Sequence, residues 1–147
     1  MAKSYQRTFV VRLVNPIIQA LIRLNVAPAG MHILSVRGRK SGRLYSTPVT
    51  LIEENGQRWL VAPYGEVAWV QNARAAKQVT LTRGQKTEVV DIVEIAATES
   101  APVLRKYLAR EPITRPYFDV HLDAPLEAFI AEAPRHPVFR LQHIARQ

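Results

Sequence analysis

The sequence predicts a mainly β domain with peripheral helices (α+β), built as a small barrel of about six antiparallel strands. Short stretches of alternating apolar and polar residues recur along the chain, separated by turns rich in Gly, Asn and Pro. A single short helical segment falls among the first five stretches, which disfavours a parallel α/β sheet. With 147 residues the chain can bury one core without disulfides, so residues 1–147 are expected to form one domain.

The N-terminal segment, residues 1–27, is expected to be helical and amphipathic. Apolar side chains recur three and four positions apart between residues 5 and 25, and basic residues flank them. Asn15 before Pro16 predicts a break, because Asn caps helices well and Pro suits the first helical position. The apolar run 13–22 is shorter than the roughly 20 residues that span a bilayer. The segment either packs on its own domain or lies in a membrane interface.

Three strands are expected next, over 32–37, 44–53 and 58–62. The glycine-containing turn at 38–42 joins the first two strands as a hairpin. The turn at 54–56 joins the second pair, because its Asn-Gly sequence is the strongest short hairpin signal.

The elements after the third strand continue this pattern of strands and short helices. We expect a helix over 66–76 with the acidic Glu66 in its first turn, and a later helix that Thr98 caps. Pro112 and Pro116 are expected to end that later helix. The remaining expected ranges are strands over 79–83 and 86–95, helices over 101–110 and 126–133, and a final strand over 137–144.

The basic charge is concentrated in the first third of the chain. The formal net charge is +8, and the first acidic residue is Glu53. A localised positive field predicts an anionic partner, which leaves a phosphorylated small molecule, an anionic membrane surface or nucleic acid, unless the charge only keeps the surface soluble. The eight basic residues before Glu53 are Lys3, Arg7, Arg12, Arg23, Arg37, Arg39, Lys40 and Arg43.

Several functional classes are disfavoured by composition. The chain has no cysteine, which excludes thiolate zinc sites, iron–sulfur clusters and catalytic thiols. Its four histidines form no metal-binding pair, so no metal is expected, and they are interpreted as surface or hydrogen-bonded structural residues. No nucleic-acid recognition module is visible, and few aromatic residues alternate with the basic ones. Because no signal peptide is recognisable, the expected location is cytoplasmic, with contact to the inner face of the membrane left open.

The segment over 37–43, Arg-Gly-Arg-Lys-Ser-Gly-Arg, has the composition of a phosphate-binding turn. Glycines let the backbone approach a phosphate closely, and Ser41 adds a hydroxyl donor. Arg39 and Lys40 would neutralise the phosphate charge. A basic surface hairpin without a ligand is the alternative for this segment taken alone.

An ordered set of motifs follows this turn. Ser46-Thr-Pro-Val49 comes first, then Trp59-Leu-Val-Ala-Pro-Tyr-Gly65, and then Trp69-Val-Gln-Asn72. In this combination, over about residues 34–84, the chain resembles the deazaflavin (F420)-dependent nitroreductase family of the split β-barrel oxidoreductases. The resemblance implies a split barrel that binds coenzyme F420 and passes its hydride to an electron-poor organic acceptor such as a quinone, enone or nitro compound.

The resemblance also implies where the coenzyme binds. The turn residues Arg39, Lys40, Ser41 and Gly42 would hold its phosphate, and Thr47, Pro48 and Val49 would lie along its ring. Trp69 and Asn72, three positions apart on the short helix, would pack on the coenzyme and contact it through a polar group. The other residues expected to line the coenzyme site are Tyr45, Ala62 and Tyr64.

Two departures from the family pattern bear on these expectations. Tyr45 stands where many relatives carry an arginine, and the loop over 62–66 is compact and lacks a lysine. No catalytic residue is assigned, although Tyr64 and Tyr117 are candidate proton donors. An FMN-binding protein and a non-catalytic carrier of fatty acids or lipids remain alternatives, and a homodimer is expected for a fold of this size.

Overall fold

A computed structural model describes residues 16, 18–24 and 27–143 of the chain. The N-terminal helix predicted before residue 16 lies outside these residues, as do the basic residues that it carries. Within the described residues, no helix combines the length and the apolar character needed to cross a bilayer.

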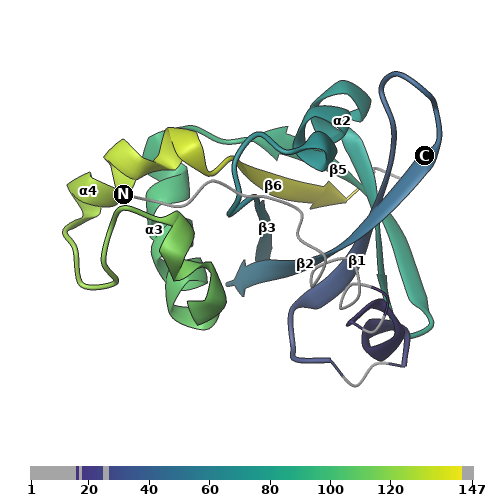
Figure 1. Ribbon diagram of the computed structural model, residues 1–147, viewed down its shortest axis with the longest axis horizontal. Coiled ribbons are helices and arrows are strands. Elements are labelled where there is room, and N and C mark those ends of the chain that lie inside the picture. The colour runs from purple at the N-terminus through teal and green to yellow at the C-terminus, as the bar shows by residue number, and fades with distance from the viewer. Residues whose placement is uncertain (1–15, 17, 25–26, 144–147) are drawn as a thin grey trace.

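The described strands form one closed antiparallel barrel (Figure 1), which confirms the predicted fold class. The order of strands around it is β1-β2-β3-β6-β5-β4, and the short helix α2 lies between β3 and β4 in sequence. The strands are β1 (Met31–Arg37), β2 (Leu44–Glu54), β3 (Gln57–Val61), β4 (Gln78–Arg83), β5 (Lys86–Glu94) and β6 (Val138–His143).

The hairpins predicted from turn residues are present. β1 pairs with β2 from Met31 opposite Thr50 to Arg37 opposite Leu44. At the β2–β3 turn Asn55 and Gly56 have φ values of 53° and 78°. Both lie in the left-handed region that this type of hairpin turn requires, so the Asn-Gly prediction is confirmed with its physical reason.

The helices are α2 (Ala68–Ala76), α3 (Ala97–Arg110) and α4 (Leu126–Glu132), with 3₁₀ turns η1 (Pro112–Tyr117) and η2 (Ala133–Arg135). Two predicted details are wrong. Glu66 precedes α2 and forms an ion pair with Arg74 near the end of that helix. Thr98 lies inside α3, whose N-cap is Ala96 and has no side-chain cap. Pro112 and Pro116 follow α3 but belong to η1, because the 3₁₀ turn tolerates prolines at these positions.

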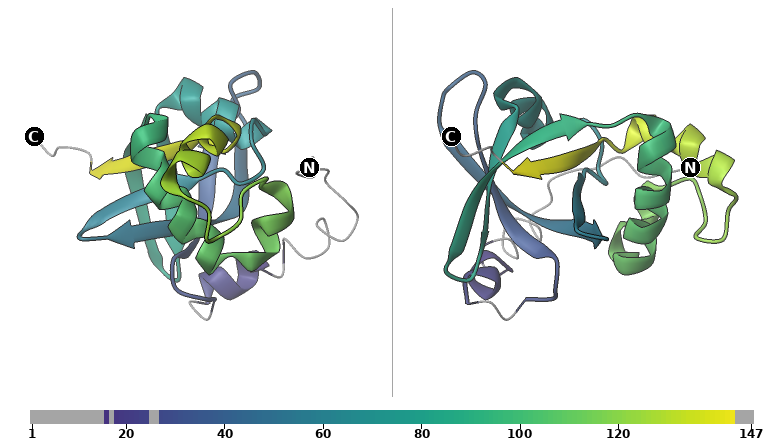
Figure 2. Two further views of the ribbon diagram at one scale, coloured as in Figure 1. Left: turned by 90° about the vertical axis from the view of Figure 1, so that its left-hand side faces the viewer. Right: turned by 180° about the vertical axis from the view of Figure 1, so that it is seen from behind.

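Two large apolar cores and one small cluster hold the described residues together. Inward-facing side chains of the strands fill the barrel together with Val70 and Ala73 of α2, which closes one end of it. The second core lies between the outer face of β2, β3 and β6 and the helices α3 and α4, which form a separate layer beside the barrel (Figure 2). The barrel is therefore packed through its middle and closed at the α2 end.

The described part of the N-terminal segment packs on the barrel. Residues 18–23 are helical, and Ile22 is fully buried against Ala27 and Ile33. The Ile22 carbonyl accepts a hydrogen bond of 2.8 Å from the backbone N–H of Gly84 in the β4–β5 turn. Of the two predicted alternatives, packing on its own domain holds for these residues.

Candidate functional site

The basic turn between β1 and β2 projects from the α2 end of the barrel (Figure 1). Two backbone hydrogen bonds close it: Gly38 N–H donates to Arg43 O at 2.7 Å, and Gly42 N–H donates to Gly38 O at 2.9 Å. Gly42 has a φ of 72°, and nothing lies within 4 Å of the position that its Cβ would occupy. The positive φ of position 42, and not a lack of space for a side chain, therefore favours glycine there.

Asn72 of α2 fixes this turn to the barrel. Its side chain is 4% exposed, and its Oδ1 atom accepts hydrogen bonds from the Arg39 backbone N–H at 3.1 Å and from Arg39 Nη1 at 2.7 Å. A buried amide oxygen with two donors is fully satisfied. Asn72 thus orients Arg39 and the first residues of the turn, a relation that the two motifs do not reveal when they are read separately.

The cations of the turn have no acidic partners among the described residues. Arg37 donates to the carbonyl of Gly42 at 3.0 Å, and Arg39 is bound by the neutral Asn72. Lys40 and Arg43 are exposed. The turn consequently keeps its full positive charge, and this donor set fits the phosphate and carboxylate groups of an anionic coenzyme.

Ser41 and Tyr45 lie together at the base of the turn. Ser41 Oγ accepts a hydrogen bond from Arg43 N–H at 3.2 Å and lies 3.4 Å from the Tyr45 hydroxyl. The Tyr45 ring packs so closely over Gly38 that a Cβ there would come within 2.7 Å of it. Tyr45 therefore has a packing role in the turn and leaves its hydroxyl at the surface.

The predicted coenzyme strand has one open edge. β2 pairs with β1 over residues 44–50, but with β3 only from Leu51 onward. Because Leu51 N–H donates to Gly30 O on the β1 side, the alternation of a β-strand directs the backbone of Ser46 and Pro48 to the other edge. No strand among the described residues pairs with that edge, and Pro48 contributes only a carbonyl there. Thr47 and Pro48 are half-buried, and Val49 is buried in the barrel.

The remaining predicted residues lie at different depths. Trp69 is half-buried and packs on Phe139 of β6, with ring centroids 6.3 Å apart and an interplanar angle of 52°. Ala62 is fully buried in the barrel core, and its N–H donates to Pro137 O at 2.8 Å. Its side chain is therefore closed to a ligand, as are those of Val61 and Pro63 on either side of it.

The two candidate proton donors, Tyr64 and Tyr117, are in contact. Their rings meet edge to face with centroids 4.7 Å apart, and both residues are half-buried. Behind them lies Tyr107 of α3, whose pKa is raised by burial and then by the nearby Glu111 and Tyr64. Tyr107 is therefore a neutral phenol, and the exposed part of the cluster consists of Tyr64 and Tyr117.

The contact between His136 and Glu132, below the loop that carries Tyr64, is absent from the sequence prediction, which gives His136 as a surface or hydrogen-bonded structural residue. His136 Nδ1 lies 2.8 Å from Pro63 O, and His136 Nε2 lies 2.7 Å from Glu132 Oε2. The histidine is thus a hydrogen-bonded structural residue, as expected for its type, and it holds the residue next to Tyr64. The spacing of four residues between Glu132 and His136 was the available signal, because such residues meet on one helical face.

Comparisons with known proteins identify a family and a shared fold. The family model of the F420H(2)-dependent quinone reductases matches residues 7–119. The structure of an F420-H2 dependent reductase (FDR-A) is similar with a TM-score of 0.54 and 21% identity, over 78% of this chain and 95% of that one. No curated protein matches the chain.

Two further solved structures share the fold. A structure described as a domain-swapped dimer has a TM-score of 0.55 and 20% identity, over 91% of this chain and 97% of that one. A protein of unknown function from Agrobacterium tumefaciens has a TM-score of 0.58 and 20% identity, over 95% of this chain and 57% of that one. The family match favours F420 over FMN and an oxidoreductase over a non-catalytic carrier. The chain belongs to the F420H2-dependent quinone reductase family, whose members are oxidoreductases that use coenzyme F420.

Proposed function

We propose that this reductase transfers a hydride from reduced F420 to an electron-poor organic acceptor, a quinone, an enone or a nitro compound. The basic turn over 37–43 would hold the coenzyme phosphate, and the open edge of β2 would lie along its ring. The observation that carries this proposal is the turn itself, whose four cations lack acidic partners among the described residues and which Asn72 fixes in place.

Each part of this site would have a distinct task. Lys40, Ser41 and the backbone around Gly42 would bind the phosphate, while Arg39, held by Asn72, would direct its charge toward it. The backbone of Ser46 and Pro48 would hydrogen-bond to the polar edge of the ring. Trp69 would cover the ring through its half-buried indole face.

The reduced coenzyme supplies a hydride when it is bound, and the acceptor takes up this hydride and one proton. A phenol can hold or deliver that proton, and Tyr64 is the candidate because it is half-exposed on the loop that follows β3. Tyr117, in edge contact with it, would fix the position of its ring. Water remains the alternative proton source, so a Tyr64→Phe variant with an unchanged turnover rate would remove the tyrosine from the reaction.

Titration with the coenzyme tests the binding site. Arg39→Ala combined with Lys40→Ala is expected to weaken F420 binding by about 1–3 kcal/mol in total, followed by coenzyme fluorescence. Lys106→Ala, an exposed lysine on α3, is the matched control and should leave the affinity unchanged. Equal affinities for the double variant and the control would contradict the assignment of the turn.

The acceptor is identified by its rate of reduction. Reduced F420 is mixed with a menaquinone analogue, a cyclic enone and a nitroaromatic compound, and its reoxidation is followed by absorbance. A quinone as the fastest acceptor would support the function of the family's description, whereas reduction of none of the three would overturn the proposed substrate class.

We also propose that the chain is a cytoplasmic homodimer that contacts the inner face of the membrane through its N-terminal segment. One structurally similar protein is described as a domain-swapped dimer, and the N-terminal segment is basic and amphipathic in sequence. Light scattering of the full chain tests the dimer. Co-sedimentation with anionic vesicles, compared with neutral ones, tests the membrane contact.

A further inference from the structure

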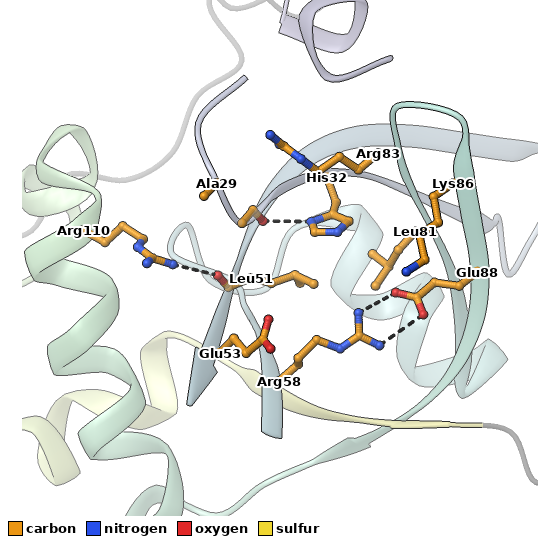
Figure 3. A pocket seen from close by; sticks show the side chains of 11 residues that line it. Ala29, His32, Leu51, Glu53, Arg58, Leu81, Arg83, Lys86, Glu88 and Arg110 are labelled. Atoms are coloured by element: carbon orange, nitrogen blue, oxygen red, sulfur yellow. Dashed lines mark hydrogen bonds and ion pairs between the residues drawn. The ribbon is translucent and has the colours of Figure 1, made fainter. Parts of the chain in front are cut away.

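A cavity of about 480 Å³ lies at the end of the barrel opposite α2 (Figure 3). Its lining comes from the start of β1 and the two residues before it, the end of β2, the start of β3, the β4–β5 hairpin and Arg110 at the end of α3. The basic turn and α2 are at the other end, where β1 and β3 finish and β4 begins. The packed barrel core lies between them, so this cavity is separate from the proposed coenzyme site.

The cavity has an apolar floor and a charged rim. Leu51 and Leu81, 2% and 1% exposed, form the floor and belong to the barrel core. Around them the side chains of His32, Arg58 and Glu88 point toward one another from three different strands (Figure 3). A volume of this size with a few convergent polar groups is typical of sites for small organic molecules.

An ion pair crosses the mouth of the cavity. Arg58 of β3 donates to both carboxylate oxygens of Glu88 on β5, at 2.5 and 3.2 Å, and the two side chains are 18% and 25% exposed. β3 and β5 are not neighbours, because β6 lies between them in the barrel. The ion pair therefore reaches across the opening from one strand to a strand that is not its neighbour. Its two hydrogen bonds hold the Arg58 guanidinium at the rim in a fixed orientation.

The rim carries more positive than negative charge. The net charge of the lining is two positive units with His32 neutral, from the cations Arg58, Arg83, Lys86 and Arg110 and the carboxylates Glu53 and Glu88. Arg83 has a structural role, since its guanidinium donates hydrogen bonds to the backbone carbonyls of Ala27, Pro28 and Met31. Lys86 has no ion-pair partner among the described residues and is exposed beside Glu88. Glu53 stands directly opposite Arg58 across the β2–β3 pair, so Glu53 and Glu88 balance Arg58 and Lys86, and the excess of two positive charges corresponds to Arg83 and Arg110.

His32 is neutral and keeps one acceptor atom. Its Nδ1 lies 2.9 Å from Gly30 O, and since a carbonyl only accepts, Nδ1 carries the proton. Burial, opposed by this hydrogen bond and assisted by the charges of Arg58 and Arg83, lowers the pKa of His32. The remaining nitrogen, Nε2, then bears a lone pair that can accept a hydrogen bond from a ligand.

We propose that this cavity is a second binding site, for a small organic anion whose apolar body rests on Leu51 and Leu81. Its anionic group lies at the rim beside Lys86, the lining cation for whose side chain the described residues offer no ion pair or hydrogen-bond partner, within a lining whose net charge is two positive units. A hydroxyl or amine of the ligand, where present, donates to Nε2 of His32. This site does not depend on the proposed coenzyme site, which lies at the other end of the barrel.

Binding of 2-naphthoate to the full chain tests the proposal, with 2-naphthamide as the neutral probe of the same shape. We expect saturable binding of the carboxylate, measured by calorimetry and by NMR shifts of the backbone amides of Gly30 and Lys86, which line the cavity. The amide should bind about fivefold more weakly or not at all, since it lacks the charge. Absence of saturable naphthoate binding, or equal affinity for the two probes, would overturn the site.

Two variants with opposite expected effects on affinity distinguish a change of charge from a loss of folding, because a folding defect would weaken binding in both. Lys86→Gln should weaken naphthoate binding about fivefold, and Glu88→Gln, which removes one of the two carboxylates of the lining, should strengthen it. Lys40→Gln in the basic turn is the control, and it should weaken F420 binding without changing naphthoate affinity. Naphthoate affinities that respond to Lys40→Gln, or to neither cavity variant, would place the ligand elsewhere and refute the proposal.

Discussion

Glu132 of α4 and His136, which follows η2, form a polar contact of 2.7 Å between Oε2 and Nε2 inside the second core. Their side chains are 1% and 3% exposed. The same carboxylate oxygen accepts the backbone N–H of Asp119 at 3.1 Å, and the imidazole stacks on Phe118 with centroids 3.8 Å apart. One buried carboxylate therefore joins α4, the segment after η1 and the loop that carries Tyr64.

Removal of this carboxylate should destabilise the protein strongly. Glu132→Leu leaves His136 Nε2 and the Asp119 N–H without their acceptor in the core, and it is expected to cost about 3 kcal/mol of unfolding free energy. Urea denaturation measures the loss. Glu127→Gln, on the exposed side of the same helix, serves as the control and should change stability by less than about 0.5 kcal/mol. Similar costs for both variants would contradict the role of the buried contact.

The variant Asn72→Asp tests whether the positive charge of the turn contributes to coenzyme binding while the turn keeps its position. The aspartate keeps an acceptor for Arg39 at the same place, so the turn stays attached to α2, but it neutralises part of the positive field. We expect a folded protein whose affinity for F420 is lower and less sensitive to salt than that of the wild type. Fluorescence titrations at two ionic strengths measure both effects, and an unchanged salt dependence would show that Arg39 does not attract the coenzyme.

The two tryptophans of the chain can be distinguished by quenching. Trp69 lies at the proposed coenzyme end on Phe139, whereas Trp59 lies on the second core, 3.4 Å from Glu99 through Nε1. Trp69→Phe should remain folded, bind F420 more weakly and lose most of the tryptophan quenching caused by the coenzyme. Trp59→Phe should retain both the affinity and the quenching. Unfolding of Trp69→Phe would instead assign this tryptophan to the core alone.

The stability of the protein should depend on pH through His32. Its pKa is lowered in the folded state by burial, so between that value and 6.5 the unfolded chain binds a proton that the folded chain does not. Stability is therefore present above pH 6.5 and is lost as the pH falls below it. His32→Gln should reduce the difference in unfolding free energy between pH 7.5 and 5.5, with the exposed His121→Gln as the control. Equal differences in both variants would exclude His32 as a source.

Gly30 and Gly56 allow the effect of neighbouring atoms on a glycine-to-alanine substitution to be compared at similar backbone conformation. Both have positive φ, 88° and 78°. A Cβ at Gly30 would meet Leu51 O at 2.9 Å, whereas nothing lies within 4 Å at Gly56. Gly56→Ala should cost about 1–2 kcal/mol from conformation alone, and Gly30→Ala should cost more because backbone atoms must move. Thermal unfolding compares the two, and the opposite order would refute the described packing around Gly30.

Local signals account for the part of the fold that the sequence predicts. Asn55 and Gly56 fix their turn through their own conformational preferences, and the alternation of β1 and β2 follows from side chains a few residues apart. The cation-rich turn was visible for the same reason. Its anchor was not, because Arg39 and Asn72 are 33 positions apart and meet only after β1 and α2 have packed.

Arg58 and Glu88, whose ion pair the sequence does not predict, are also far apart in sequence and meet only in the folded barrel. Arg58 and Glu88 lie on strands that do not pair, so neither a hairpin register nor a spacing rule places them together. Closure of the barrel brings them face to face. The cap predicted at Thr98 is wrong for a different reason. Thr98 has a high propensity for the N-cap position, but α3 begins one residue earlier, at Ala97.

The plugged interior has a mechanical consequence. No molecule can travel inside the barrel from the cavity to the basic turn, because α2 and the packed leucines block the way. The two ends nevertheless share β2, on which Pro48 and the cavity floor residue Leu51 are separated by three residues, or about 10 Å of strand. Communication between an occupant at one end and the chemistry at the other would therefore run as a displacement of this strand along its open edge, and not as diffusion through a channel.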